Sequence, residues 1–395
     1  MADHPPADVV VVGAGIAGTA TAFYLARTGR RVTLIDQQHP AWGASGRNPG
    51  FLWLQTKAAG TSMQFALAGR AFAEALAEEM PPYGFRPCGG LITYRDERLA
   101  PIAEAFARDR TAAGLPVEHI GRKAVHNLTP ALSDAVSGAL WNPRDAHQDT
   151  RTLVGHLATM AEASGSTVLR GVRVQALRVD GGRCRGVVLT DGSRIDAATT
   201  VVATGPWSAA LLAPVGLRLP LEPMRFEAAE TAPAPFRLEP VVCGQALFKF
   251  FNTAGASADA LPSHPAEALH KGLMFTEQIA QFPDGSVQFG CAFQYGSDDD
   301  RPTVAGQAMA ATIMAENVRD FAGLPLKRTW AGVVGNTPDG LPVIDIAPGI
   351  EGLAINAGHF FGNLVGAMSG RMIAAALADE LPPYPLEAFR LARFN

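Results

Sequence analysis

The sequence has few charged residues and no long apolar run. Only 18% of its 395 residues are Asp, Glu, Lys or Arg, and the formal net charge is −4. Such a balance provides no basic surface for nucleic acid or for an anionic membrane. No segment reaches the roughly 18 unbroken apolar residues that a membrane-spanning helix needs, and the N-terminal MADHPPAD has no basic signal region. We therefore expect a cytoplasmic protein without a membrane span or a nucleic-acid partner.

Cysteine is also scarce. The four cysteines are far apart in the sequence and form no Cys-x-x-Cys pair: Cys88, Cys184, Cys243 and Cys291. Reduced, mostly buried thiols are expected, and no iron–sulfur spacing is present. The acidic run Asp298–Asp300 lacks further oxygen ligands at fixed spacing, so it predicts a solvated turn. We expect no metal site.

The stretch from Asp8 to Asp36 carries the clearest motif. Its four valines, Val9–Val12, predict a parallel strand that is buried on both faces. A G-x-G-x-x-G turn follows at once, formed by Gly13, Gly15 and Gly18. The first glycine permits the tight turn, the second lets the backbone approach a pyrophosphate, and the third lets a helix pack closely on the strand.

Three further signals complete this pattern. A helix is expected over residues 16–28 with Gly29 as its C-cap, followed by a second strand over residues 31–35. The N-terminus of the helix offers unpaired N–H groups to a phosphate. Asp36 lies about 20 residues beyond the glycine turn, where an acid binds ribose hydroxyls. The stretch predicts dinucleotide binding, with NAD or FAD favoured over NADP.

Residues 43–50, Gly-Ala-Ser-Gly-Arg-Asn-Pro-Gly, are too rich in small and turn-forming residues for regular structure. An ordinary surface loop is one interpretation. However, Arg47 and Asn48 are strong hydrogen-bond donors, and their small neighbours allow close approach of a flat or phosphorylated ligand. Residues 61–80 predict an amphipathic helix that ends before Pro81.

Later segments supply two more candidate contacts with a cofactor. Short strands between residues 167 and 203 lead into Thr204-Gly205, at the carboxyl edge of a parallel sheet. Gly358–Asn363 is a glycine-rich turn that leads into a helix over residues 364–378, another place where an anion or dipole is stabilised. Between these segments, we expect strands over residues 246–252, 272–275 and 286–293, and a helix over residues 304–321.

Four blocks now stand in order along the chain: VVVGAGIAGTATAFYLARTG with VTLID, then GASGRNPG, VVATGPWS, and TPDGLPVI followed by AINAGHFFGNLVGAMSGRMIAAAL. In this combination the sequence resembles the FAD-dependent D-amino acid oxidase superfamily, which includes glycine, sarcosine and glutamylputrescine oxidases and D-amino acid dehydrogenases. The resemblance spans nearly the whole chain. The first block fits any FAD or NAD protein, whereas the GASGRN and C-terminal blocks are more selective.

The resemblance implies an α/β fold with two interleaved domains. One is a Rossmann-type, GR2-like FAD-binding domain, expected at residues 1–80, 145–218 and 328–395. The other is an α+β substrate-binding domain on a mainly antiparallel sheet, expected at residues 81–144 and 219–327.

The resemblance also implies a set of FAD contacts. The glycine turn would hold the pyrophosphate and Asp36 the adenosine ribose, Val174 would meet adenine, and residues 358–364 would lie at the pyrimidine end of the flavin. No cysteine stands near the C-terminal blocks, so non-covalent FAD is expected. The implied cofactor-binding residues are Gly13, Ala14, Gly15, Ile16, Ala17, Gly18, Asp36, Gln37, Ala44, Ser45, Arg47, Asn48, Gly50, Val174, Ala203, Thr204, Gly205, Trp207, Gly358, His359, Phe360, Phe361, Gly362, Asn363 and Leu364.

The chemistry implied by the resemblance is oxidation of a C–N bond in a small amine or amino acid. A hydride passes from the carbon to flavin N5, and the resulting imine hydrolyses to a carbonyl compound and an amine. Either oxygen or an electron carrier would then reoxidise the flavin.

One departure from the family pattern concerns the substrate carboxylate. Many members carry an arginine before the TPDG block, as R-P-x-T-P-D-G, whereas residues 331–340 read AGVVGNTPDG. Arg225, Lys249 or Arg301 would have to replace it as the carboxylate partner. Alternatively, the substrate is an amine, or an N-substituted amino acid that is held differently.

Histidine 359 has two interpretations. His359 either contacts the flavin and tunes substrate protonation, or it is a structural donor that fixes the turn. Several aromatic residues are candidates for the wall of the substrate cavity, although core packing explains each of them singly: Trp53, Phe248, Phe250, Phe251 and Tyr295.

Two other functions remain open at this stage. The chain is either a self-sufficient enzyme or the catalytic FAD subunit of a heteromeric opine or imino-acid dehydrogenase, which would pass electrons to a small iron–sulfur partner. A non-catalytic dinucleotide-binding protein is the alternative from a different class, because fold alone does not establish function.

Overall fold

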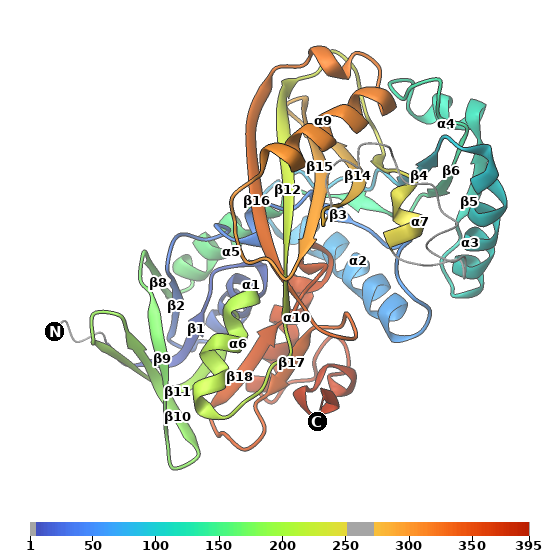
Figure 1. Cartoon of the computed structure of the whole chain (residues 1–395). Helices are drawn as coiled ribbons and strands as arrows, with labels where there is room; N and C mark the ends of the chain where they lie inside the picture. The colour runs from blue at the N-terminus through green and yellow to red at the C-terminus, as the bar shows by residue number, and fades with distance from the viewer. Residues whose placement is uncertain (1–4, 251–271, 395) are drawn as a thin grey trace.

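The computed structural model describes residues 5–250 and 272–394. Figure 1 shows two lobes, each organised around one of two eight-stranded sheets, with the long strands β12 and β16 running from the upper lobe towards the lower one. A two-stranded ribbon of β3 and β7 completes the described sheets (Phe51–Leu52 and Ala146–His147).

The first sheet has the order β17-β18-β11-β1-β2-β8. The strands from β18 to β8 are parallel, β17 is antiparallel to β18, and a hairpin of β9 and β10 extends from β11. The strands are β1 (Ala7–Val12), β2 (Val32–Asp36), β8 (Thr167–Arg170), β9 (Val174–Asp180), β10 (Arg183–Leu189), β11 (Arg194–Val202), β17 (Val343–Ile346) and β18 (Leu353–Ala357).

Apolar residues cover both faces of this sheet. Val9 and Val11 belong to a core cluster on one side, and Val10 and Val12 to a cluster on the other. This burial explains the unbroken valine run, because a half-exposed strand would alternate polar and apolar residues. Helix α1 (Ile16–Ala26) is buried along its whole length and packs against α5 (Thr150–Ala163) and α10 (Gly362–Leu377).

The second sheet has the order β16-β12-β15-β14-β13-β4-β6-β5. Every pairing in it is antiparallel except that of β13 with β4, as expected for a mainly antiparallel sheet. The strands are β4 (Gly90–Tyr94), β5 (Glu118–Gly121), β6 (Gly138–Asn142), β12 (Glu222–Pro233), β13 (Val241–Cys243), β14 (Met274–Gln281), β15 (Ser286–Tyr295) and β16 (Leu326–Asn336).

The remaining helices flank these sheets. Helix α9 packs on β15, β12 and β14, and Glu227 of β12 accepts hydrogen bonds from the N-cap Thr303 through its backbone N–H (2.7 Å) and its hydroxyl (2.9 Å). The helices are α2 (Thr61–Glu79), α3 (Ala100–Ala112), α4 (Arg122–Leu128), α6 (Ser208–Leu212), α7 (Ala246–Phe250) and α9 (Val304–Asn317).

The strand expected over residues 246–252 is wrong where the structure describes it, because residues 246–250 form helix α7. Its entry is fixed by Glu277, whose carboxylate accepts from the Ala246 backbone N–H (3.2 Å), and Leu247 and Phe248 are both buried. A short apolar run fits a buried strand as well as a buried helix, so the sequence pattern of residues 246–252 did not distinguish a strand from a helix. The expected domain limit at residue 328 falls inside β16, which pairs with β12 of the second sheet.

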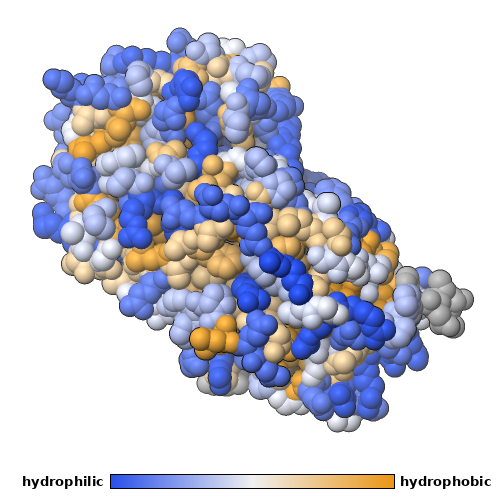
Figure 2. All heavy atoms as spheres, turned by 180° about the vertical axis from the view of Figure 1, so that it is seen from behind, coloured by the Kyte–Doolittle hydropathy of each residue, from blue (hydrophilic) through white to orange (hydrophobic). Residues whose placement is uncertain are grey.

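The described helices include none that is long and apolar enough to cross a membrane. Seen from behind, the surface in Figure 2 is largely hydrophilic, with apolar atoms spread between polar ones.

The contact between α1 and α10 gives a test of packing. A Cβ atom on Gly370 would lie 2.5 Å from the Ala20 Cβ and 2.7 Å from the Thr21 backbone nitrogen. We expect Gly370→Ala to lower the free energy of unfolding by about 1–3 kcal/mol, as overpacked cores do. The matched control is Gly155→Ala in α5, where a Cβ atom would meet no other atom within 4 Å. This substitution should raise the free energy of unfolding by about 0.5–1 kcal/mol. Urea unfolding of both variants measures the difference, and equal effects would contradict the packing argument.

Candidate functional site

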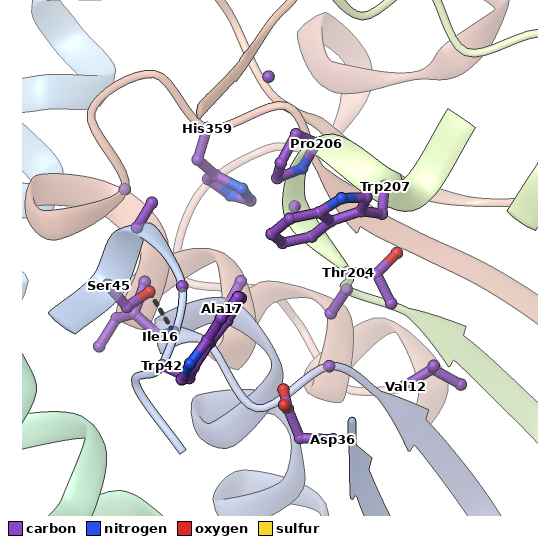
Figure 3. Close-up of a pocket in the computed structure, with 18 of the residues that line it drawn as sticks. Val12, Ile16, Ala17, Asp36, Trp42, Ser45, Thr204, Pro206, Trp207 and His359 are labelled. Carbon is purple, nitrogen blue, oxygen red and sulfur yellow. Dashed lines mark hydrogen bonds between the residues drawn. The ribbon is translucent and has the colours of Figure 1, made fainter. Parts of the chain in front are cut away.

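A cavity of about 460 Å³ lies at the carboxyl ends of β1, β2 and β11. Its wall combines the glycine turn after β1, the end of β2, the loop of residues 42–48, the segment after β11 and the turn before α10. Segments that are more than 300 residues apart in the sequence therefore meet here. Figure 3 shows the side chains around this cavity.

The glycine turn forms the floor of the cavity. Gly13 has a φ of +103°, and a Cβ atom at this position would lie 2.5 Å from the Ala203 carbonyl oxygen. Gly15 is the N-cap of α1 and contributes no side-chain cap. Ser45 from the following loop accepts a hydrogen bond from the Ile16 backbone N–H (3.0 Å), which is the dashed line in Figure 3. The N-terminus of a buried helix thus faces open space, an arrangement that favours anions.

Asp36 occupies the end of β2. Its carboxylate accepts from the backbone N–H groups of Ala14 (2.7 Å) and Gln38 (2.8 Å) and lines the cavity (Figure 3). Each oxygen retains a lone pair for another donor. The beginning of β9, including Val174, borders the cavity beside Asp36 and Gln37.

Two tryptophans stand on the outer side of the cavity. Trp42 and Trp207 have ring centroids 6.4 Å apart, and Figure 3 shows both indoles among the side chains that line the cavity. Trp207 is 40% exposed, which is unusual for so large an apolar side chain. The Arg47 guanidinium packs on the Trp42 ring at 4.4 Å.

His359 enters the cavity from the turn before α10 (Figure 3). Its Nε2 lies 2.9 Å from the Ser369 hydroxyl. Burial lowers the pKa of His359 to about 4, so the ring is neutral at neutral pH. His359 is therefore hydrogen-bonded within the protein and also lines the cavity, and its contact with a flavin stays a prediction.

Most of the expected cofactor residues line this cavity. They are Gly13, Gly15, Ile16, Ala17, Asp36, Gln37, Ala44, Ser45, Asn48, Val174, Ala203, Thr204, Gly205, Trp207, His359, Phe360, Gly362 and Asn363.

The other expected residues stand behind the wall or outside it: Ala14, Gly18, Arg47, Gly50, Gly358, Phe361 and Leu364. Gly18 is pressed against the turn, since a Cβ there would lie 1.8 Å from the Gly13 carbonyl oxygen. Arg47 points to the second sheet, where its Nη1 donates to the Ala331 carbonyl (2.7 Å) and to Asp300 (3.0 Å).

Sequence reasoning missed several wall residues. Some are adjacent to the motifs and could have been included on that basis, whereas the contribution of β16 has no local signal because it arises from pairing in the second sheet. The missed residues are Val12, Ile35, Trp42, Gly43, Val172, Arg173, Gln175, Pro206, Ala210, Leu211, Val333, Val334, Gly335 and Asn356.

A smaller cavity of about 100 Å³ adjoins the first and shares wall residues with it, namely Asn48, Val334, Phe360 and Asn363. The second sheet forms much of its remaining wall, through Met224 and Phe226 of β12 and Phe293 of β15. Trp53 also lines it. By contrast, Phe248 packs on Phe106, Tyr295 is 44% exposed, and Phe251 and the Phe250 side chain lie outside the described residues.

The two expected carboxylate partners whose side chains the structure describes, Arg225 and Arg301, do not line either cavity. Arg225 is buried on the face of β12 opposite Met224 and Phe226, and its guanidinium pairs with Gln294 (2.6 Å) and Glu227 (3.2 Å). This outcome corrects the assignment of Arg225, and its physical reason is the alternation of side chains along a strand. Arg301 is exposed and pairs with Asp299 (2.8 Å). The Lys249 side chain lies outside the described residues.

In the part of the chain that the structure describes, no group of three His, Cys, Asp or Glu side chains gathers to hold a metal ion. The four cysteines are free, and Cys243 and Cys291 line the smaller cavity. Burial raises the pKa of Cys291 to about 12 and that of Cys243 well above its ordinary value, so both are neutral thiols.

The lowered pKa of His359 predicts a pH effect on stability. Below pH 6.5 the unfolded chain binds a proton at this residue, whereas the folded chain binds it only near pH 4. The free energy of unfolding should therefore decrease as the pH falls from 6.5 to 4, by up to about 1.4 kcal/mol per pH unit from this residue. We expect His359→Asn to make the decrease shallower in urea unfolding between pH 4.5 and 7.5. The exposed His39→Asn controls for loss of an imidazole, and an unchanged slope in His359→Asn would contradict the assignment.

Comparisons with known proteins agree with this geometry. The family model for FAD dependent oxidoreductases matches residues 8–379. D-amino acid dehydrogenase from Rhizobium johnstonii is 27% identical, over 98% of this chain and 100% of its own length, and glycine oxidase from Geobacillus kaustophilus is 27% identical, over 98% and 97%.

Solved structures give the same result. Glycine oxidase from Geobacillus kaustophilus superposes with a TM-score of 0.85 at 25% identity and covers 99% of both chains. Iminodiacetate oxidase from Chelativorans has a TM-score of 0.80 at 27% identity and covers 97% of this chain and 98% of its own. These matches cover nearly the whole chain. The chain therefore belongs to the FAD-dependent oxidoreductase family, and its cofactor is FAD.

Proposed function

We propose that FAD binds non-covalently in the large cavity, with its pyrophosphate at the N-terminus of α1 and its adenosine ribose on Asp36. The residues present fit this group. A Cβ atom at Gly13 would collide with the Ala203 backbone, and the N-cap Gly15 has no side chain of its own at the helix N-terminus. Ser45 accepts from the Ile16 N–H, and the other N–H groups of the first turn would face a phosphate. None of the described residues that line this cavity is a cysteine, and the two cysteines of the smaller cavity, Cys243 and Cys291, are buried neutral thiols.

The flavin end would lie between the turn before α10 and the smaller cavity. Phe360 and Asn363 border both cavities, so a ring held between them would face the small one. Helix α10 begins after Phe361 without a side-chain cap, and its dipole would stabilise negative charge at the pyrimidine end of the ring.

We infer that the reaction is oxidation of a C–N bond in an amino acid or amine. FAD supplies the hydride acceptor, and the imine product hydrolyses in water. The chain orients the substrate C–H bond and excludes water from the reacting atoms, which is the task of the largely apolar small cavity. This cavity, adjoining the flavin end, is the observation that carries the proposal. Relatives named for glycine, D-amino acids and iminodiacetate support the reaction class.

Anaerobic flavin spectra test the proposed function. We expect the purified protein to be yellow and its flavin band to bleach with at least one compound in a panel of amines, N-substituted amino acids and D- or L-amino acids. Re-admission of air then separates an oxidase, which recovers its colour quickly, from a dehydrogenase that needs a separate electron acceptor or partner subunit. A protein with no flavin band after reconstitution with FAD would refute the proposal.

The ribose contact of Asp36 has its own test. We expect Asp36→Ala to raise the Kd for FAD by about 10- to 150-fold, because hydrogen bonds to a charged acceptor contribute about 1.5–3 kcal/mol each. Fluorescence titration of the apoprotein measures this change. Asp96→Ala is the control, since Asp96 also accepts a backbone N–H, from Arg98, but does not line the cavity. Equal Kd values for the two variants would refute the assignment.

A further inference from the structure

The wall of the small cavity is aromatic on several sides. Phe51 and Trp53 form one pair with ring centroids 5.8 Å apart, and Phe360 and Phe361 form another at 4.4 Å. Phe293 of β15 and Phe226 of β12, which lie opposite each other in the strand register, add two more aromatic rings to the wall. Aromatic faces pack well on apolar substituents.

The amide side chains in this wall are engaged with other protein groups. The Gln278 amide donates to the Thr276 hydroxyl (2.8 Å). The Asn48 amide donates to the carbonyls of Ala44 (3.1 Å) and Ser45 (2.7 Å). The Asn363 amide donates to the Phe51 carbonyl.

The Trp53 indole N–H, which is buried in the same wall, has no hydrogen-bond partner in the described part of the chain. One neutral donor does not replace the ion pair that a desolvated carboxylate needs.

Cations are missing from the part of this wall that the structure describes. In the R-P-x-T-P-D-G pattern, the arginine position corresponds to Val334, whose side chain borders both cavities. A valine therefore stands where the pattern places a carboxylate partner.

Among the residues that the structure describes, the neighbouring cations do not replace this arginine, and the Lys249 side chain lies outside the described residues. The guanidinium of Arg47 is engaged by Asp300 and the Ala331 carbonyl, and that of Arg225 lies on the far face of β12. Lys57 packs its Nζ on the Phe361 ring but does not line the cavity. Lys57 is only 4% exposed, and burial lowers its pKa well below the ordinary value.

We propose that the preferred substrate is an apolar primary or secondary amine that carries no carboxylate on the reacting carbon. This inference rests on the proposed function and names its substrate class. A carboxylate in the small cavity would lose its hydration without a compensating ion pair, which is unfavourable. An alkyl or aryl substituent would instead pack on the aromatic wall.

The same wall assists the chemistry of an amine. Hydride leaves the carbon most readily when the nitrogen is neutral and its lone pair is available. An apolar environment disfavours the charged ammonium form, so the amine would enter the cavity in its neutral form and leave its proton with bulk water.

Matched substrate pairs test the proposal on the holoenzyme. Isobutylamine and valine, and benzylamine and phenylglycine, differ only in the carboxylate, and both enantiomers of each amino acid are used. Anaerobic stopped-flow mixing gives the limiting rate of flavin bleaching divided by Kd. We expect this ratio of rate to Kd to be at least about 100-fold higher for each amine than for its matched amino acid, because the carboxylate of the amino acid is left unpaired.

The outcomes distinguish this proposal from the proposed function. If an amino acid bleaches the flavin as well as its matched amine or better, C–N oxidation stands and the amine preference is refuted. If no compound of the wider panel bleaches the flavin, the proposed function itself fails.

Substitution at Val334 provides the second test. Val334→Arg would place a guanidinium at the border of the small cavity. We expect this substitution to raise the limiting rate of flavin bleaching divided by Kd for valine or phenylglycine by at least about tenfold, relative to the matched amine. Val334→Leu changes size without charge and should keep the amine preference. An unchanged preference in a Val334→Arg protein that binds FAD would overturn the role of this position, and if that variant does not bind FAD, the wild-type pairs decide.

Discussion

The contact between the glycine turn and the end of β11 is the constraint on which the site depends. The turn after β1 comes so close to the Ala203 carbonyl that only a residue without a Cβ fits at Gly13. The same approach directs α1 into the centre of the molecule, where α5 and α10 bury it. A helix N-terminus is thereby held at the carboxyl edge of a parallel sheet, the usual position of ligands in such folds.

The sequence was most informative where the determinants are local. The valine run, the three glycines and Asp36 predicted the strand, the turn and the acid, because each depends on the backbone conformation of its own segment. The mainly antiparallel second sheet was expected from family resemblance. Its register was not, because pairing such as that of Phe226 with Phe293 joins residues that are distant in the sequence.

The substrate side shows where sequence reasoning reaches its limit. The sequence shows that the arginine before the TPDG block is absent, but it does not show how the side chains of the other candidate carboxylate partners are oriented. The sequence allowed Arg225 as a carboxylate partner, but the alternation of side chains along β12 directs Arg225 to the α9 side of the sheet, beside Glu227. Likewise, residues 246–250 form a helix because Glu277, about 30 residues later, fixes its first turn. Both results depend on tertiary partners that no local pattern specifies.

Strand β16 connects the two halves of the site. Its Trp330 indole donates to the Arg47 carbonyl (2.7 Å), Arg47 donates back to Ala331 (2.7 Å), and Val334 borders both cavities. The second sheet and the loop of residues 43–50 are thus joined by reciprocal hydrogen bonds. Under the proposed function this strand would be pleiotropic in evolution, because a mutation there that admits a new substrate would also alter how firmly the cofactor is held. Lineages of this fold would therefore diversify more freely through β14 and β15, which contact the small cavity alone.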